Sequence, residues 1–153
     1  MSDSKPVLVS ACLLGQRCRY DGRHNEDGEL QRLLARRREQ AVPFCPEQAG
    51  GLATPRPAAW IERADAGAVL DGEDRVVTDA GRDVTGEFVA GAESALAECR
   101  AHGIEHAYLK ERSPSCGVRN THVAGVLVEG PGVTADLLAR NGIAVEGVEG
   151  RRD

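Results

Sequence analysis

Short apolar runs alternate along the chain with longer stretches in which apolar residues recur every three or four positions. Continuous apolar runs occupy 6–10, 41–44 and 106–109, as expected for strands of a parallel sheet that is covered on both faces. Apolar side chains at helical spacing predict one helix over 29–40 and another that starts at 83 or 85 and ends near 102. The alternation of strands and helices predicts an α/β fold with a small, Rossmann-like open sheet, mostly parallel.

The segment 58–79 interrupts this rhythm with three short apolar runs separated by turn residues, one of them Asp71-Gly72. We expect a β-hairpin or meander, with strands at 60–62, 68–70 and 75–77, inserted into the α/β frame as a cover near the site. The remaining expected elements are a strand or extended lid at 123–128, a helix at 131–140 and a last strand at 143–145. With 153 residues, the chain 1–153 is expected to form a single domain.

Composition narrows the function classes. The formal net charge is -5 and only 3% of residues are aromatic, which argues against a protein that coats nucleic acid through phosphates or stacked bases. No apolar run is long enough for a membrane span, and residues 1–5 lack the apolar core of a signal peptide. We therefore expect a cytoplasmic protein with no membrane or nucleic-acid partner.

Five cysteines in such a compartment favour metal binding or catalysis over disulfide formation. Three of them, Cys12, Cys45 and Cys116, each lie just beyond the end of a predicted strand. Ligand sites of open α/β sheets form at the carboxyl ends of the strands, where the following loops converge. The sequence therefore predicts that these three cysteines meet at one site, although free cysteines are often simply small buried hydrophobic residues.

Three thiolates about 6 Å apart would repel pairwise by about 3 kcal/mol at an effective dielectric constant near 20, so they need a cation to hold them. A zinc ion with a fourth ligand or water satisfies this requirement, and so does an iron–sulfur cluster with one iron left open. Cys18 is either a fourth ligand or, as we favour, a structural residue of the loop. Cys99 lies on the buried stripe of a predicted helix and belongs to the core.

Three oxygen-bearing side chains stand beside these cysteines. Glu47 follows Cys45-Pro46 and is either a general acid or base or an ordinary carboxylate paired with arginine. Ser113 and Ser115 precede Cys116 and either cap backbone donors or donate a hydrogen bond to a substrate.

The chain resembles the thiouracil desulfurase family in a set of motifs that spans nearly its whole length: Val9 to Gly15, Cys18 to Gly22, Cys45-Pro46-Glu47, Gly50-Gly51-Leu52, Pro55-Arg56-Pro57 and Ser113 to Gly117. The resemblance implies a [4Fe-4S] cluster held by Cys12, Cys45 and Cys116; zinc stays the alternative that the chemistry of three thiolates leaves open. It implies that one iron has no protein ligand, that Glu47 is the catalytic acid or base, and that the catalytic serine is Ser113 or, as second choice, Ser115. One departure is the run 118–122, where a more apolar or tyrosine-containing sequence is expected.

The resemblance implies an enzyme that converts a free thiolated pyrimidine, such as 4-thiouracil, into uracil and sulfide without net redox change, as a monomer or homodimer. Two other interpretations stay open. One is a non-catalytic iron–sulfur or zinc protein that acts as a sensor or sulfur carrier. The other is the processing of thiolated tRNA, which the acidic net charge disfavours.

Overall fold

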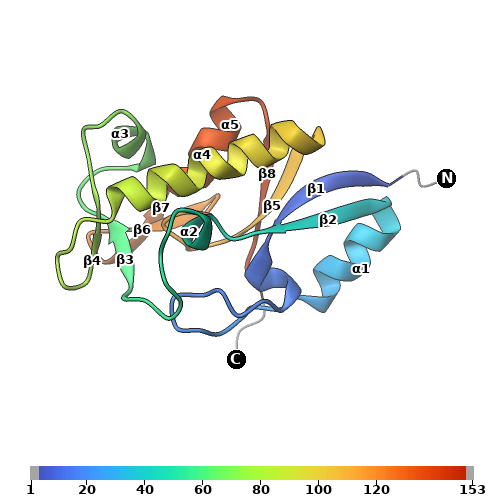
Figure 1. Cartoon of the computed structure of the whole chain (residues 1–153), viewed down its shortest axis with the longest axis horizontal. Coiled ribbons are helices and arrows are strands. Elements are labelled where there is room, and N and C mark those ends of the chain that lie inside the picture. The colour runs from blue at the N-terminus through green and yellow to red at the C-terminus, as the bar shows by residue number, and fades with distance from the viewer. Residues whose placement is uncertain (1–3, 151–153) are drawn as a thin grey trace.

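The computed structural model describes residues 4–150 and contains two four-stranded sheets with helices packed against them (Figure 1). In the first sheet every neighbouring pair is parallel. Its strand order is β2 (Glu39–Phe44), β1 (Lys5–Ser10), β5 (His106–Lys110) and β8 (Ala144–Val148). The chain thus moves one way from β1 to β2 and the other way from β1 to β5, which makes the gap between β1 and β5 the topological switch point. The predicted α/β fold class is confirmed.

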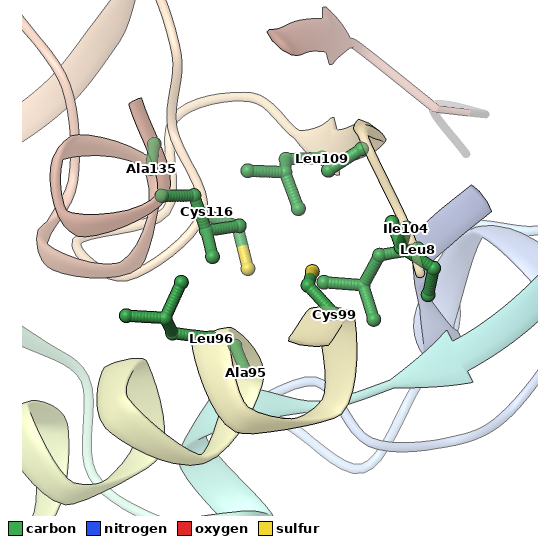
Figure 2. Packing of buried hydrophobic residues seen from close by; sticks show 10 residues of the cluster. Leu8, Ala95, Leu96, Cys99, Ile104, Leu109, Cys116 and Ala135 are labelled. Carbon is green, nitrogen blue, oxygen red and sulfur yellow. The ribbon is translucent and has the colours of Figure 1, made fainter. Parts of the chain in front are cut away.

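Helices cover both faces of the parallel sheet, which explains the continuous apolar runs of its strands. Leu8 and Leu109 pack against α4 (Thr85–His102) and α5 (Val133–Arg140) in the cluster drawn in Figure 2. Val7, Val9 and Tyr108, which alternate with them along the strands, face α1 (Gly28–Arg37). Cys99 is completely buried in the first cluster, as expected from its place on α4.

The second sheet lies beside the first and has the order β4 (Val76–Thr78), β3 (Ala59–Ile61), β6 (Asn120–Val123) and β7 (Val126–Glu129). Its outer pairs are antiparallel, and β3 and β6 are parallel, with Ile61 opposite Val123. The expected hairpin within 58–79 is therefore present as β3 and β4. It is half of a mixed sheet whose other half comes from 120–129.

The expected strand at 68–70 is wrong, because this segment is part of the short helix α3 (Ala66–Leu70). The carboxylate of Asp65 caps the helix by accepting a hydrogen bond from the Ala68 backbone N–H at 2.8 Å. The buried residues are Ala66 and Val69, three positions apart, which is helical rather than strand spacing. A local cap therefore outweighed the β propensity of the apolar run.

Two boundaries also differ from expectation. The helix expected over 29–40 ends at Arg37, because Arg38 adopts a left-handed conformation with φ 55° and β2 starts at Glu39. Of the segment 123–128, which was expected as a strand or an extended lid, residues 126–128 do lie in a strand, β7. Val123 ends β6, and residues 124–125 form the turn between the two strands. Two short helices, the 3₁₀ helix Ala11–Leu14 and α2 (Pro46–Ala49), follow β1 and β2 directly. In residues 4–150, no helix has the length and apolar character needed to cross a membrane.

Candidate functional site

A cavity of about 540 Å³ opens at the carboxyl end of the parallel sheet, between its strand-end loops and the second sheet. The three predicted ligands Cys12, Cys45 and Cys116 all line it, although they are far apart in the sequence. Cys18 lines the same cavity. Of the three predicted oxygen-bearing residues, Glu47 and Ser113 lie in its wall, whereas Ser115 does not.

The Cys12 loop folds back on itself directly after β1. The chain makes one 3₁₀ turn and reverses at Gly15, whose φ of 92° is in the left-handed region that glycine adopts most readily. The backbone carbonyl of Cys12 accepts a hydrogen bond from Asn25 N–H at 2.8 Å. The Cys12 backbone is thereby tied to the segment that leads into α1, with the thiol at the cavity wall.

Cys45 and Glu47 are placed by the close packing of α2 against α4. A Cβ atom on Gly91 of α4 would overlap the carbonyl oxygen of Pro46, and one on Gly50 would overlap the carbonyl oxygen of Glu87. The two helices can therefore approach only because both contact positions are glycine. Since α2 has a single turn, this contact with α4 fixes the direction in which Cys45 and Glu47 point.

The Cys116 loop is held from two sides. The hydroxyl oxygen of Ser113 accepts hydrogen bonds from the backbone N–H groups of Ser115 and Cys116, at 3.1 and 3.0 Å. The first turn of α5 donates Val133 N–H to the carbonyl of Pro114 and Thr134 N–H to the carbonyl of Ser115, both at 2.8 Å. Ser115 is fully buried, and its hydroxyl lies 2.7 Å from that of Thr134. Ser115 therefore fastens the loop to α5.

Glu111 supports the same loop from inside the protein. Its side chain is fully buried, and its carboxylate accepts hydrogen bonds from the backbone N–H groups of Val118, Arg119 and Asn120. Burial by itself would raise the pKa of this carboxyl, but the Arg119 guanidinium and the backbone donors lower the pKa below its ordinary value. A Cβ atom on Gly147 of β8 would collide with the carboxylate, so Gly147 provides the room for it.

The thiols around the cavity interact with one another. Burial raises the pKa of the Cys116 thiol to about 12, and a hydrogen bond with Cys12 is the main cause that raises the pKa of Cys18 to about 11. A hydrogen bond with Cys18 likewise raises the pKa of Cys45. In the absence of a metal these groups therefore stay protonated at neutral pH. Their conversion to thiolates requires a bound cation, whose binding releases the protons.

Cys116 lies at the border between the cavity and the core. It is 4% exposed and packs beside Leu96, Leu109 and Ala135, with Cys99 on the neighbouring turn of α4 (Figure 2). Unlike Cys99, it also lines the cavity. Apolar side chains therefore cover one side of this thiol and exclude water from that side.

Two cations complete the cysteine side of the cavity. Arg56, with a side chain only 7% exposed, donates to the Glu47 carboxylate from Nη2 at 2.8 Å and from Nε at 3.1 Å. Its Nη2 also donates to the carbonyl of Cys18 at 2.9 Å. Lys110 lines the cavity with its pKa lowered by burial and donates from Nζ to the carbonyl of Glu111. Glu47 is thus a cavity residue and an arginine partner. The predicted pairing with arginine is present, and its role as a general acid or base stays a prediction.

Among residues 4–150, no three His, Cys, Asp or Glu side chains are arranged to hold one metal ion. The cysteines instead line a cavity of about 540 Å³, which is large enough for a cofactor of several atoms. This donor set, all thiols with an apolar backing, fits an iron–sulfur cluster. It fits a single zinc ion less well, because zinc needs its ligands gathered tightly around one point.

The sequence predicted that the insertion 58–79, which contains Trp60, covers the site, and Trp60 lines the cavity. The sequence did not assign Tyr20 and His122 to the cavity, which they also line. Nothing in the sequence marked His122, because its place in the cavity depends on how β6 pairs with β3.

A family model described as 2-thiouracil desulfurase matches residues 7–149. The chain belongs to this family. A solved structure described as a [4Fe-4S]-dependent thiouracil desulfidase, TudS, is 46% identical, with a TM-score of 0.78, and the match covers 94% of this chain and 91% of that one. The uncharacterized protein YbbK of Bacillus subtilis is 39% identical over 142 residues, which are 91% of this chain and 93% of YbbK. The predicted family is confirmed, and with it the prediction of an enzyme for thiouracil desulfuration.

Proposed function

We propose that this protein removes sulfur from a free thiolated pyrimidine, with 4-thiouracil as the expected substrate and uracil and hydrogen sulfide as the products. The observation that carries the proposal is the convergence of Cys12, Cys45 and Cys116, each from a different strand end, on one cavity that also contains Glu47. The family match and the desulfidase of similar fold support this chemistry.

Cys12, Cys45 and Cys116 are the proposed ligands of a [4Fe-4S] cluster in this cavity. When bound by three cysteines, such a cluster supplies one iron without a protein ligand, a Lewis acid suited to a soft thiocarbonyl sulfur. The net reaction consumes one water. Its oxygen replaces the sulfur on the ring carbon, and its two protons leave with the sulfur as hydrogen sulfide, so no electron donor or acceptor is required.

Glu47 is the proposed general base that takes a proton from the attacking water and later returns it toward the departing sulfur. Its side chain is 17% exposed, and two nitrogens of Arg56 hold its carboxylate. Both nitrogens donate to Oε2, so Arg56 fixes that oxygen and does not engage Oε1. Arg56 also binds the carbonyl of Cys18, so it positions the carboxylate relative to the cysteine loop.

Ser113 is the proposed hydrogen-bond donor. Two backbone N–H groups donate to its hydroxyl oxygen and occupy the two lone pairs of that atom. The hydroxyl proton is then directed away from the loop, and Ser113 lines the cavity. We assign Ser113 to a donor contact with the reacting base and Ser115, through Thr134, to the positioning of the loop.

The test begins with air-free purification and reconstitution of the cluster, followed by iron and sulfide counts and the visible spectrum. Turnover is measured as loss of thiouracil absorbance, with 4-thiouracil and 2-thiouracil side by side. We expect Cys116→Ala to lose the cluster and at least 1,000-fold of the activity, about 4 kcal/mol. Cys99→Ala is the matched control, since it makes the same change in the same buried cluster but outside the cavity lining. Full turnover by the Cys116 variant would falsify the proposal.

A second candidate is a non-catalytic iron–sulfur protein with four cysteine ligands, which leaves no iron open. The position of Cys18 favours it: this thiol lines the cavity and interacts with both Cys12 and Cys45. Cys18→Ser separates the two functions. The enzyme retains the spectrum of its cluster and its turnover, whereas a protein with closed coordination loses its cluster.

A further inference from the structure

The second sheet presents two side chains to the cavity from neighbouring strands. Ile61 of β3 pairs with Val123 of β6 in parallel register, and both side chains are buried in the cluster that packs on α4. Since successive residues of a strand point to opposite faces, the preceding residues Trp60 and His122 lie side by side on the other face. Both line the cavity.

A hydrogen bond fixes the protonation pattern of the His122 ring. Its Nδ1 lies 2.8 Å from the backbone carbonyl oxygen of Arg112. A carbonyl oxygen only accepts, so Nδ1 carries the proton. In the neutral ring Nε2 is therefore a hydrogen-bond acceptor. The same bond holds the ring in place, because Arg112 belongs to the segment that leads from β5 to Ser113.

Trp60 forms the flat part of this wall. A Cβ atom added to Gly125, in the turn between β6 and β7, would lie 4.0 Å from its ring, so the hairpin turn closes over the ring edge. The chain has only five aromatic residues of the Phe, Tyr and Trp types, and three of them, Tyr20, Phe44 and Trp60, line the cavity. Flat aromatic surfaces bind nucleobases by stacking, at about 1–3 kcal/mol per base.

We propose that Trp60 and His122 form the base-recognition wall of this enzyme: Trp60 stacks on the pyrimidine, and Nε2 of His122 accepts a hydrogen bond from one ring N–H. This inference rests on the proposed function and names the feature of the substrate that is selected. A thiouracil has N–H donors at N1 and N3, and a fixed acceptor favours a base whose contacted nitrogen carries hydrogen. A base that is alkylated or glycosylated at that nitrogen cannot donate this hydrogen bond, and its substituent would clash with the imidazole ring of His122.

The test compares wild-type protein with His122→Leu and His122→Gln, each with its cluster reconstituted. The substrates are 4-thiouracil and its 1-methyl and 3-methyl derivatives. For wild type, methylation at the contacted nitrogen is expected to raise KM by about 10-fold to 100-fold, the usual effect of leaving a buried polar group unpaired. In His122→Leu, KM for 4-thiouracil is expected to rise by a similar factor. Methylation at the same nitrogen then raises KM no further. His122→Gln, with an acceptor at nearly the same distance from the backbone, recovers part of the selectivity.

A binding measurement gives an independent readout, because Trp60 is the only tryptophan. Titration with uracil is expected to quench its fluorescence in wild type, with a weaker apparent affinity in His122→Leu. His102→Leu is the control, since His102 lies at the end of α4 and pairs with Glu98, outside the cavity lining.

The outcomes separate this inference from the proposed function. Suppose that wild type desulfurates thiouracil but that the effect of each methyl group on KM is the same in wild type and in His122→Leu. The proposed role of His122 in base recognition is then wrong, and the proposed reaction is unaffected. Trp60 fluorescence that stays unchanged on addition of uracil would likewise overturn the recognition wall alone. If wild type with an intact cluster desulfurates no thiouracil, the proposed function itself fails.

Discussion

The parallel sheet meets the cavity with the ends of its strands, whereas the second sheet meets it with the sides of two strands. Cys12 lies in the 3₁₀ helix after β1, Cys45 lies between β2 and α2, and Cys116 lies in the loop that follows β5. Trp60 and His122 stand within β3 and β6. The first arrangement gathers reactive groups from distant parts of the chain. The second presents a wall with the regular spacing of a sheet.

The difference shows how each side is kept in place. The cysteine-bearing segments lack the backbone hydrogen-bond ladder of a sheet. Their conformation therefore depends on buried groups such as Glu111 and on the close packing of glycines against neighbouring segments. The side chains of the second sheet need only the β3–β6 pairing. We therefore expect changes on the parallel-sheet side to act on chemistry or stability, and changes on the second sheet to act on substrate binding.

Among changes that leave the cluster in place, the largest effect is expected for Glu47→Gln, which keeps the shape of the side chain but removes the proposed base. The rate constant kcat should fall by about 10²-fold to 10⁴-fold, the range typical for loss of general acid–base catalysis. The cluster spectrum and KM should change little. Glu98→Gln, on the solvent side of α4, is the control. An unchanged kcat for Glu47→Gln would contradict the proposal that residues on the parallel-sheet side of the cavity carry out the catalysis.

A smaller effect, on stability, is expected for Glu111→Gln. The amide places an N–H₂ group against backbone donors that the carboxylate now satisfies, so we expect a loss of about 2–3 kcal/mol in the free energy of unfolding at pH 7. Because the folded-state pKa of Glu111 is below its ordinary value, its contribution is complete above the unfolded pKa and is lost as pH falls through the folded pKa.

The stability difference between wild type and Glu111→Gln should therefore shrink on acidification below about pH 4. Urea unfolding at about pH 7, 5 and 3.5 measures it. A difference that is constant over this range would show that the carboxylate charge is not the stabilising feature.

The smallest effect is expected for Gly91→Ala in α4, where the added methyl group meets the carbonyl of Pro46. Overpacking of this kind costs about 1–3 kcal/mol, and displacement of α2 should also lower turnover, since α2 carries Glu47. Gly86→Ala in the first turn of the same helix has open space around it and should stabilise by about 0.5–1 kcal/mol. Urea unfolding and turnover of both variants check this prediction. If both variants behaved alike, the close contact between α2 and α4 would not be what orients Cys45 and Glu47.

Much of this architecture was predictable from local patterns. The strands and the cysteines after them were recognisable because a buried parallel strand is continuously apolar and a site residue follows its carboxyl end. The segment 68–70 was predicted wrongly because one capping contact by Asp65 decided between helix and strand. The roles of Ser113 and Ser115 could not be separated, because the two hydroxyls differ only in whether the loop turns them toward the cavity or toward Thr134.

The sequence alone determined the fold class and the three cysteines that face one cavity, because these depend on residue order and on rules for parallel sheets. It also determined the family, through the resemblance of its motifs. Only the tertiary structure decided that Glu47 is held by Arg56, that Glu111 supports the Cys116 loop, and that Trp60 and His122 share a wall. The physical reason is that each of these contacts joins segments whose register is set by packing and strand pairing. No local pattern of residues encodes that register.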